Sequence, residues 1–167
     1  MASGETLFPF HPFNNEPPSS NPATPDLRNQ HPVLDFNDTT DEEAVFSGIM
    51  PQAYSDGGIT VLIHYSATTA TSGNVVWQVA LERVGDQQQD VDSDDFAAFQ
   101  SSGAVAVPST SGLVDIISIN FSSGAQMDSV TAGEKFRLKA RRDADDTSAT
   151  DSVSGDIELH AVEIREQ

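Results

Sequence analysis

Aspartate residues gathered in short runs are the side chains of this chain best suited to chemistry. The run DVDSDD holds Asp90, Asp92, Asp94 and Asp95. Because Ca²⁺ prefers clustered hard oxygens, such a run resembles the start of a calcium-binding loop. The sixth position of that loop should be glycine and the twelfth a bidentate glutamate, but this chain has Asp95 and Ser101 there. The run therefore favours a solvated acidic loop, with a calcium site of another type as the alternative.

A second acidic segment lies between residues 143 and 156. Two carboxylates can hydrolyse a glycosidic bond when a cleft raises the pKa of one of them by burial. The residues between these aspartates are mostly Ser, Thr and Ala, which offer no apolar wall for such a cleft. The segment therefore predicts a polar loop and no catalysis. Its aspartates are Asp143, Asp145, Asp146, Asp151 and Asp156.

The remaining chemical side chains form no recognisable catalytic or metal-binding motif. The histidines, which are His11, His31, His64 and His160, show neither HxH nor HExxH spacing, so no zinc site is expected. The chain has no GxSxG elbow, no glycine-rich phosphate loop and no cysteine. We therefore predict that the protein is not an enzyme and uses no cofactor or metal.

One stripe of basic side chains is the most specific polar feature of the sequence. Lys135, Arg137, Lys139 and Arg141 alternate with Phe136, Leu138 and Ala140, so on a strand the four cations line one sheet face. The pattern favours cross-strand pairing with acidic neighbours. The candidate partners are Glu82, Glu158 and Glu163. The alternative is a docking face for an acidic partner.

These side chains must be positioned by strands, because apolar residues recur with a period of two. The clearest case is Asn74–Val84, where Val75, Trp77, Val79 and Leu81 share one face. No long helical pattern occurs. The spacing predicts an all-β, antiparallel two-sheet β-sandwich of jelly-roll type. The expected strands are Val33–Phe36, Ala44–Met50, Ile59–Tyr65, Asn74–Val84, Ala104–Val107, Gly112–Phe121, Glu134–Arg141 and Asp156–Arg165.

The last of these strands changes phase along its length. Ile157 and Leu159 have one parity, whereas Val162 and Ile164 have the other. A β-bulge near His160-Ala161 would turn both pairs toward the core, so we predict one there.

Residues 1–32 differ from the rest, and we predict that they form an extended arm on a β-sandwich domain of residues 33–167. Seven of the nine prolines fall in this segment, and proline disfavours both helix and sheet ladders. Leu7, Phe8, Phe10 and Phe13 are interleaved with them. Because exposure of these side chains to water is unfavourable, we expect the arm to bury them on a partner. The alternatives are an arm that folds back on its own domain and a disordered arm.

The composition limits the partners. The formal net charge of −18 opposes binding to nucleic acid and to anionic membranes. No apolar run is long enough to span a bilayer. The start of the chain, MASGETLFPF, has neither a basic region nor an apolar core, so we expect no signal peptide.

Three segments of residues 33–165 resemble a β-domain of tailed-phage virion structural proteins. They read LDFNDTTDEEAVFSGIMPQAY, ATTATSGNVVWQVALERV and DSVTAGEKFRLKARRDADDTSATDSVSGDIELHAVEIRE. The resemblance covers about four fifths of the chain, everything but the arm. It implies a jelly-roll-like sandwich on the virion and brings no active-site residues with it.

Within that resemblance, a short chain with an arm is typical of a capsid decoration (cement) protein. The expected location is the capsid exterior. The expected partners are the major capsid protein and neighbouring copies, in a homo-oligomer, preferably a trimer. Binding only to assembled shell would stabilise the shell by mass action. The alternative is a receptor- or glycan-binding module of a tail or head fibre. That function requires an exposed aromatic platform, and the Tyr and Trp residues are few: Tyr54, Tyr65 and Trp77.

Overall fold

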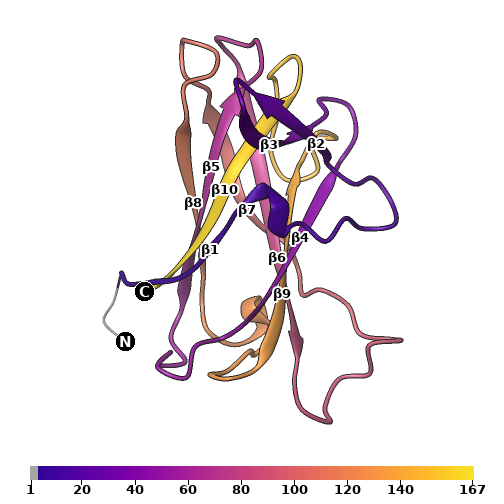
Figure 1. Cartoon of the computed structure of the whole chain (residues 1–167), viewed down its shortest axis with the longest axis vertical. Coiled ribbons are helices and arrows are strands. Elements are labelled where there is room, and N and C mark those ends of the chain that lie inside the picture. The colour runs from indigo at the N-terminus through magenta and orange to yellow at the C-terminus, as the bar shows by residue number, and fades with distance from the viewer. Residues whose placement is uncertain (1–3) are drawn as a thin grey trace.

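A computed structural model describes residues 4–167 as two antiparallel sheets packed face to face (Figure 1). The larger sheet has the order β2-β3-β10-β5-β8, with β1 also paired to β10, and the smaller has the order β4-β9-β6-β7. This confirms the predicted jelly-roll-like β-sandwich. The elements are β1 (Thr6–Phe10), η1 (Pro12–Asn14), β2 (Thr24–Arg28), β3 (His31–Phe36), β4 (Glu43–Ile49), β5 (Ile59–Ala67), β6 (Asn74–Val84), β7 (Gln100–Ala106), β8 (Asp115–Phe121), η2 (Ala125–Met127), β9 (Lys135–Arg142) and β10 (Ile157–Glu166).

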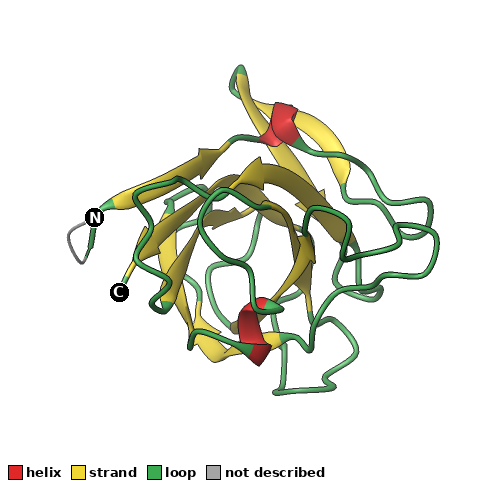
Figure 2. Cartoon of the chain, turned by 90° about the horizontal axis from the view of Figure 1, so that it is seen from below, coloured by secondary structure: helices red, strands yellow, loops and turns green. Residues whose placement is uncertain are grey.

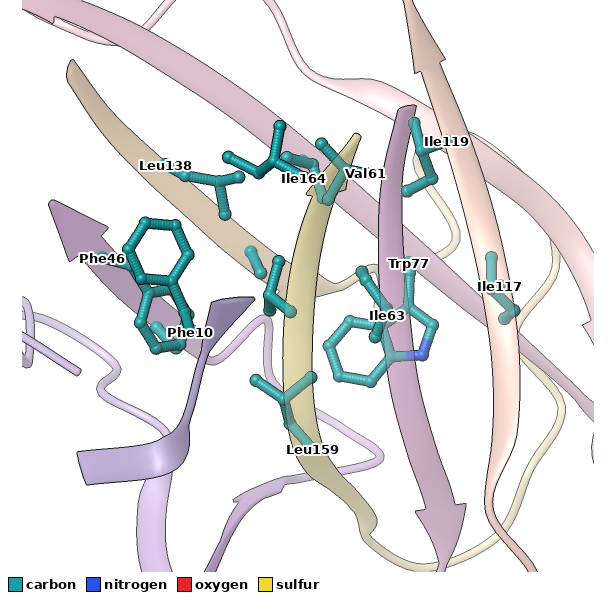
Figure 3. Packing of buried hydrophobic residues seen from close by; sticks show 14 of the residues in the cluster. Phe10, Phe46, Val61, Ile63, Trp77, Ile117, Ile119, Leu138, Leu159 and Ile164 are labelled. Carbon is teal, nitrogen blue, oxygen red and sulfur yellow. The ribbon is translucent and has the colours of Figure 1, made fainter. Parts of the chain in front are cut away.

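The alternating side chains of the strands fill the space between the sheets, as Figure 3 shows. On β6, Trp77 is fully buried and lies edge-on to the rings of Phe36 and Tyr65, with centroids 4.9 and 6.2 Å away. Seen from below, the strands curve around this common interior (Figure 2). None of the helices in the described part of the chain is long and apolar enough to cross a membrane.

The predicted bulge in β10 is confirmed. The pairing of β10 with β5 shifts register between Leu159 and Ala161. As a result, Leu159 and Val162 both point into the core and are at most 1% exposed. His160, which lies at the shift, is partly exposed on the outer face of the larger sheet.

Residues 4–32 of the segment predicted to be a separate arm are part of the sandwich, and residues 1–3 lie outside the described part of the chain. β1 pairs with the second half of β10, and β2 forms a hairpin with β3. Between them the chain runs along the edge of β4, where the amide of Glu16 donates to the carbonyl of Val45 at 2.7 Å. The predicted boundary at residue 33 is therefore corrected, because the segment supplies strands to one sheet and protects the edge of the other.

Prolines in these strands are tolerated because of where the strands lie. β1 and β2 are each hydrogen-bonded on one side only, to β10 and β3. A residue without an N–H is compatible with an edge strand, where half of the backbone groups face outward. Pro9 and Pro25 therefore do not prevent pairing, contrary to the inference from proline content.

Candidate functional site

A groove on the outer face of the larger sheet is the main candidate site. It consists of two adjoining hollows of about 560 and 300 Å³. The first lies between η1 with the preceding His11, the start of β3 and His160. The second lies between the β2–β3 turn, His160 and the segment that leads into β8. His31 and His160 line both hollows, so these form one continuous surface, which we call the groove.

The short helix η1 presents an aromatic ring at the groove. Pro12 is buried, and the amide of His11 donates to Oδ1 of Asn14 at 2.8 Å, which closes the turn. With Pro12 packed inward, Phe13 points away from the protein and is 80% exposed. It is the most exposed of the large apolar side chains in residues 4–167. A ring in this position is available to a ligand lying in the groove.

A buried polar network supports the floor of the groove. Arg28 forms an ion pair with Glu158, whose side chain is only 5% exposed. Arg28 also donates to the backbone carbonyls of Ala67 and Thr68 at 3.0 and 3.2 Å. Ser66, which is fully buried, donates to Oε2 of Glu158 at 2.9 Å. The network therefore joins β2, β5 and β10 beneath the groove.

One glycine makes room for this arrangement. Gly112 has a φ of +79°, which favours glycine, and its amide donates to the carbonyl of Ala67 at 3.0 Å. A Cβ atom at this position would lie 2.7 Å from Nη2 of Arg28. The guanidinium therefore occupies space at the edge of the second hollow that a side chain at position 112 would fill.

Asp35 lies beside this network on β3, opposite Glu158 in the sheet. Burial, together with the charges of Asp26, Glu158 and other acids, raises the pKa of Asp35 to about 6. Its Oδ1 atom is buried and has no hydrogen-bond partner in the described part of the chain. The ionised form of Asp35 is therefore destabilised in the folded protein.

This environment predicts a pH-dependent effect of Asp35→Asn on stability. The folded-state pKa is above the unfolded value, so the native state binds the extra proton between about pH 4 and 6, and stability falls as pH rises through that window. The linkage has an upper limit of about 3 kcal/mol, and partial solvent screening should reduce it to about 1–2 kcal/mol. Asp35→Asn should raise the free energy of unfolding by that amount at pH 8 and by much less at pH 4.

Urea unfolding at pH 4 and pH 8 measures this difference. Asp92→Asn, which removes the same charge from an exposed loop, is the matched control and should have little effect at either pH. An equal effect of Asp35→Asn at both pH values would contradict the prediction.

The basic stripe on β9 is paired within the protein. Arg137 binds Glu82 at 2.8 Å, which confirms one of the predicted cross-strand pairs. Lys139 binds Glu43 at 3.0 Å and Arg141 binds Asp41 at 3.3 Å, while Lys135 is exposed. The other two predicted acids lie on the opposite sheet, where Glu158 pairs with Arg28 and Glu163 with Arg165.

Two rings of the β6–β7 loop also cover the stripe. Phe96 lies under Arg137 and Lys139, at 5.2 and 4.5 Å from its centroid, and Phe99 lies 4.0 Å from the guanidinium of Arg141. Such contacts hold the loop on the sheet face. Three of the four cations therefore already have acidic or aromatic partners in the same protein. Docking of an acidic partner on this face stays a prediction, and the structure does not favour it.

The predicted partner-binding residues of the arm separate into two groups. Leu7 and Phe10 are buried in the protein's own core, and Phe8 packs against that core. Only Phe13 remains available on the surface. The inference that all four bind a partner is therefore corrected for the first three, because β1 pairs with β10 and these side chains pack in or against the protein's own core.

Two aspartates of the second acidic segment take part in a small cluster of carboxylates. Among residues 4–167, the only group whose ligand atoms converge within 4.8 Å is Asp41, Asp143 and Asp145. Burial opposes ionisation of Asp143, but hydrogen bonds that it accepts from Thr147 and Ser148 together outweigh this effect and lower its pKa to about 2. Asp143 and Asp41 therefore have partners within the protein, the latter in an ion pair with Arg141, and the Asp90–Asp95 run is not part of the cluster.

Sequence reasoning missed most of the groove. The Tyr and Trp residues cannot form the aromatic platform, because Tyr54, Tyr65 and Trp77 are each at most 4% exposed. His11, His31 and His160 come from distant parts of the chain, so no spacing rule joins them. The one available signal was the phase change in β10, which places His160 at a bulge.

Comparisons with known proteins find relatives of the fold. No family model and no curated protein matches this chain. It is similar to the CBM22-1 xylan-binding domain of Paenibacillus barcinonensis Xyn10C, with a TM-score of 0.50, 13% identity and coverage of 99% of this chain and 96% of that one. It is also similar to the CBM22-2 xylan-binding domain of Xyn10C, with a TM-score of 0.51, 14% identity and coverage of 96% of this chain and 99% of that one.

A third similar structure is a much longer enzyme, the family GH115 4-O-methyl-α-glucuronidase BtGH115A. The TM-score is 0.52 at 11% identity, and the match covers 99% of this chain but only 18% of that one. At such low identities these similarities establish the jelly-roll-like sandwich fold.

Proposed function

We propose that this protein is a carbohydrate-binding module that binds a neutral glycan in the groove beside Phe13. The observation that carries the proposal is an aromatic ring, 80% exposed, at a groove whose lining also includes three histidines and two asparagines. The xylan-binding domains of Xyn10C, which share the fold, support the same class of ligand.

The chemistry of the groove suits a sugar. Binding sites for small ligands combine apolar surface with a few polar groups that fix orientation, in pockets of about 300–1,000 Å³. The ring of Phe13 can cover the apolar C–H face of a pyranose, while Asn14, Asn29 and the histidines can bond to hydroxyl groups. The net charge of −18 opposes polyanionic glycans, so the ligand should be neutral.

Affinity electrophoresis with soluble polysaccharides tests the proposal directly. The protein would be run in native gels that contain xylan, laminarin, mannan or cellulose-derived oligomers, and a glycan array would extend the panel. Retardation by at least one neutral glycan is the expected result. Absence of binding to every neutral glycan in both assays would overturn the proposal.

Phe13→Ala should weaken binding to the retarding glycan about tenfold. Loss of one partly buried aromatic contact corresponds to about 1–2 kcal/mol, and 1.4 kcal/mol is a factor of ten in affinity. Isothermal titration calorimetry would measure the change. Val91→Ala is the matched control, because Val91 is 72% exposed and lies on the β6–β7 loop, outside the groove. Equal losses of affinity in the two variants would show that Phe13 does not contact the glycan.

Capsid decoration remains a prediction of the resemblance to phage virion proteins, and with it the exterior location and the trimer. The structure adds no observation in its favour. Co-sedimentation with capsids that lack the protein, alongside the solution mass of the free protein, would test it.

A further inference from the structure

A chain of hydrogen bonds runs from Arg28 to His160 beneath the groove. Arg28 donates to Oε2 of Glu158, and the hydroxyl of Ser66 contacts the same oxygen at 2.9 Å. The Oγ atom of Ser66 also lies 2.8 Å from Nε2 of His160. Because Ser66 is fully buried, water does not compete for its hydroxyl.

The direction of every bond in this chain follows from the donors available. An ionised carboxylate only accepts hydrogen bonds, and a serine hydroxyl has a single proton. The hydroxyl of Ser66 therefore donates its proton to the carboxylate of Glu158, whose charge is balanced by Arg28. The Oγ atom of Ser66 must then accept, so Nε2 of His160 carries the donating proton. The other ring nitrogen, Nδ1, is left without a proton in the neutral imidazole.

The surroundings of His160 keep the ring neutral. Burial lowers its pKa, and so do the nearby charges of Arg28, His31 and His64, while Glu158 opposes them. Asp35 on β3, with Asp26 and Asp156 near it, and His11 before η1 are further titratable side chains beside the network and the groove. No hydrogen bond from Nδ1 to any of residues 4–167 is present. At neutral pH Nδ1 is therefore an unused acceptor on a side chain that lines both hollows.

We propose that His160 fixes the orientation of the ligand by accepting a hydrogen bond at Nδ1 from a ligand hydroxyl, with its tautomer set by Ser66, Glu158 and Arg28. This inference rests on the proposed glycan-binding function. It assigns His160 as a residue that determines specificity, and it assigns Ser66 as a positioning residue that acts through the imidazole. A ligand whose contacted hydroxyl is replaced by a group without a donor would lose this bond.

Nitrogen-15 NMR of the histidine side chains tests the tautomer without any ligand. At pH 7.5 His160 should give the spectrum of a single Nε2–H tautomer. Ser66→Ala should convert it to a mixture of tautomers, whereas the spectrum of His64, which is not in the chain of bonds, should stay unchanged. An Nδ1–H tautomer in the unmodified protein, or a His160 spectrum that Ser66→Ala does not alter, would overturn the proposal.

Calorimetry with the glycan identified by affinity electrophoresis tests the contact itself. His160→Leu, which has no acceptor, should bind about three- to tenfold more weakly, as expected for loss of one neutral hydrogen bond. His160→Asn keeps a side-chain acceptor and should retain most of the affinity. A thermal melt of each variant would confirm folding.

The two proposals fail in different ways. If the unmodified protein binds the glycan and Phe13→Ala weakens binding, but His160→Leu binds like the unmodified protein, the role of His160 is wrong and the glycan-binding function stands. If the unmodified protein binds no glycan, the function fails and this inference fails with it, although the NMR spectrum still reports the tautomer.

Discussion

Replacement of Arg142 by methionine is expected to lower the free energy of unfolding by about 3–5 kcal/mol, because it leaves a buried carboxylate without its partner. Arg142 is fully buried at the end of β9 and forms an ion pair with Asp151, whose side chain is 3% exposed. The guanidinium donates to both carboxylate oxygens of Asp151, at 2.7 and 2.9 Å. It also donates to the carbonyl groups of Phe36, Val153 and Gly155.

These contacts use all of the donor capacity of the arginine side chain. They also attach the loop from 143 to 155 to the core, since Asp151, Val153 and Gly155 all lie in it. Lysine lacks the planar guanidinium that binds both carboxylate oxygens at once, so Arg142→Lys should destabilise the protein less than Arg142→Met but more than no change. Urea unfolding followed by fluorescence of Trp77 would measure the free energy of unfolding for each variant.

The control is an arginine in an exposed ion pair. Arg165 is 44% exposed and binds Glu163 at 2.8 Å, so Arg165→Met should change stability by less than about 1 kcal/mol. A change of under 1 kcal/mol in Arg142→Met as well would show that the buried pair does not stabilise the fold.

The inner strands of the sandwich could be predicted because their sequence pattern is local. β6 matches its predicted bounds, Asn74–Val84, and Phe136, Leu138 and Ala140 of β9 point inward as expected. The bulge in β10 was predictable for the same reason, since a phase change in a half-buried strand requires an extra residue.

The position of the N-terminal segment was not predictable, because it depends on partners distant in sequence. Thr6–Phe10 pairs with residues 162–165, and its Pro9 and adjacent aromatic residues give no alternating pattern. The prolines of this segment predict an irregular arm. A strand forms instead because the second half of β10 offers an edge with which β1 can pair.

The groove could not be predicted from the sequence either, because it also depends on residues that are distant along the chain. Its residues come from η1, the β2–β3 turn and the bulge of β10, which the fold brings together. The sequence predicts Glu158 as a partner for the stripe on β9, but β9 and β10 belong to different sheets. Pairing of strands, which the sequence pattern does not specify, thus decides which charges meet.

Replacement of Phe10 by alanine is expected to lower the free energy of unfolding by about 3–5 kcal/mol, the usual range for a buried phenylalanine. Phe10 is 4% exposed, and its ring stacks on those of Phe8 and Phe46 with centroids 5.5 and 5.3 Å apart. Phe136 of β9 lies edge-on, 6.3 Å away. The residue therefore connects β1 to the smaller sheet across the core.

Phe13→Ala provides a closely matched control for this prediction, because it removes the same ring three positions along the chain. Phe13 is 80% exposed, so its loss should change stability by less than about 0.5 kcal/mol. If the segment were an arm that binds a partner, neither variant would change the stability of the isolated protein. If β1 is a strand of the sandwich, only Phe10→Ala is destabilising. Equal unfolding curves for the two variants would therefore show that β1 leaves the sandwich in solution. A large difference would establish that Phe10 belongs to the core, whereas Phe13, three positions along the chain, is free to meet a ligand.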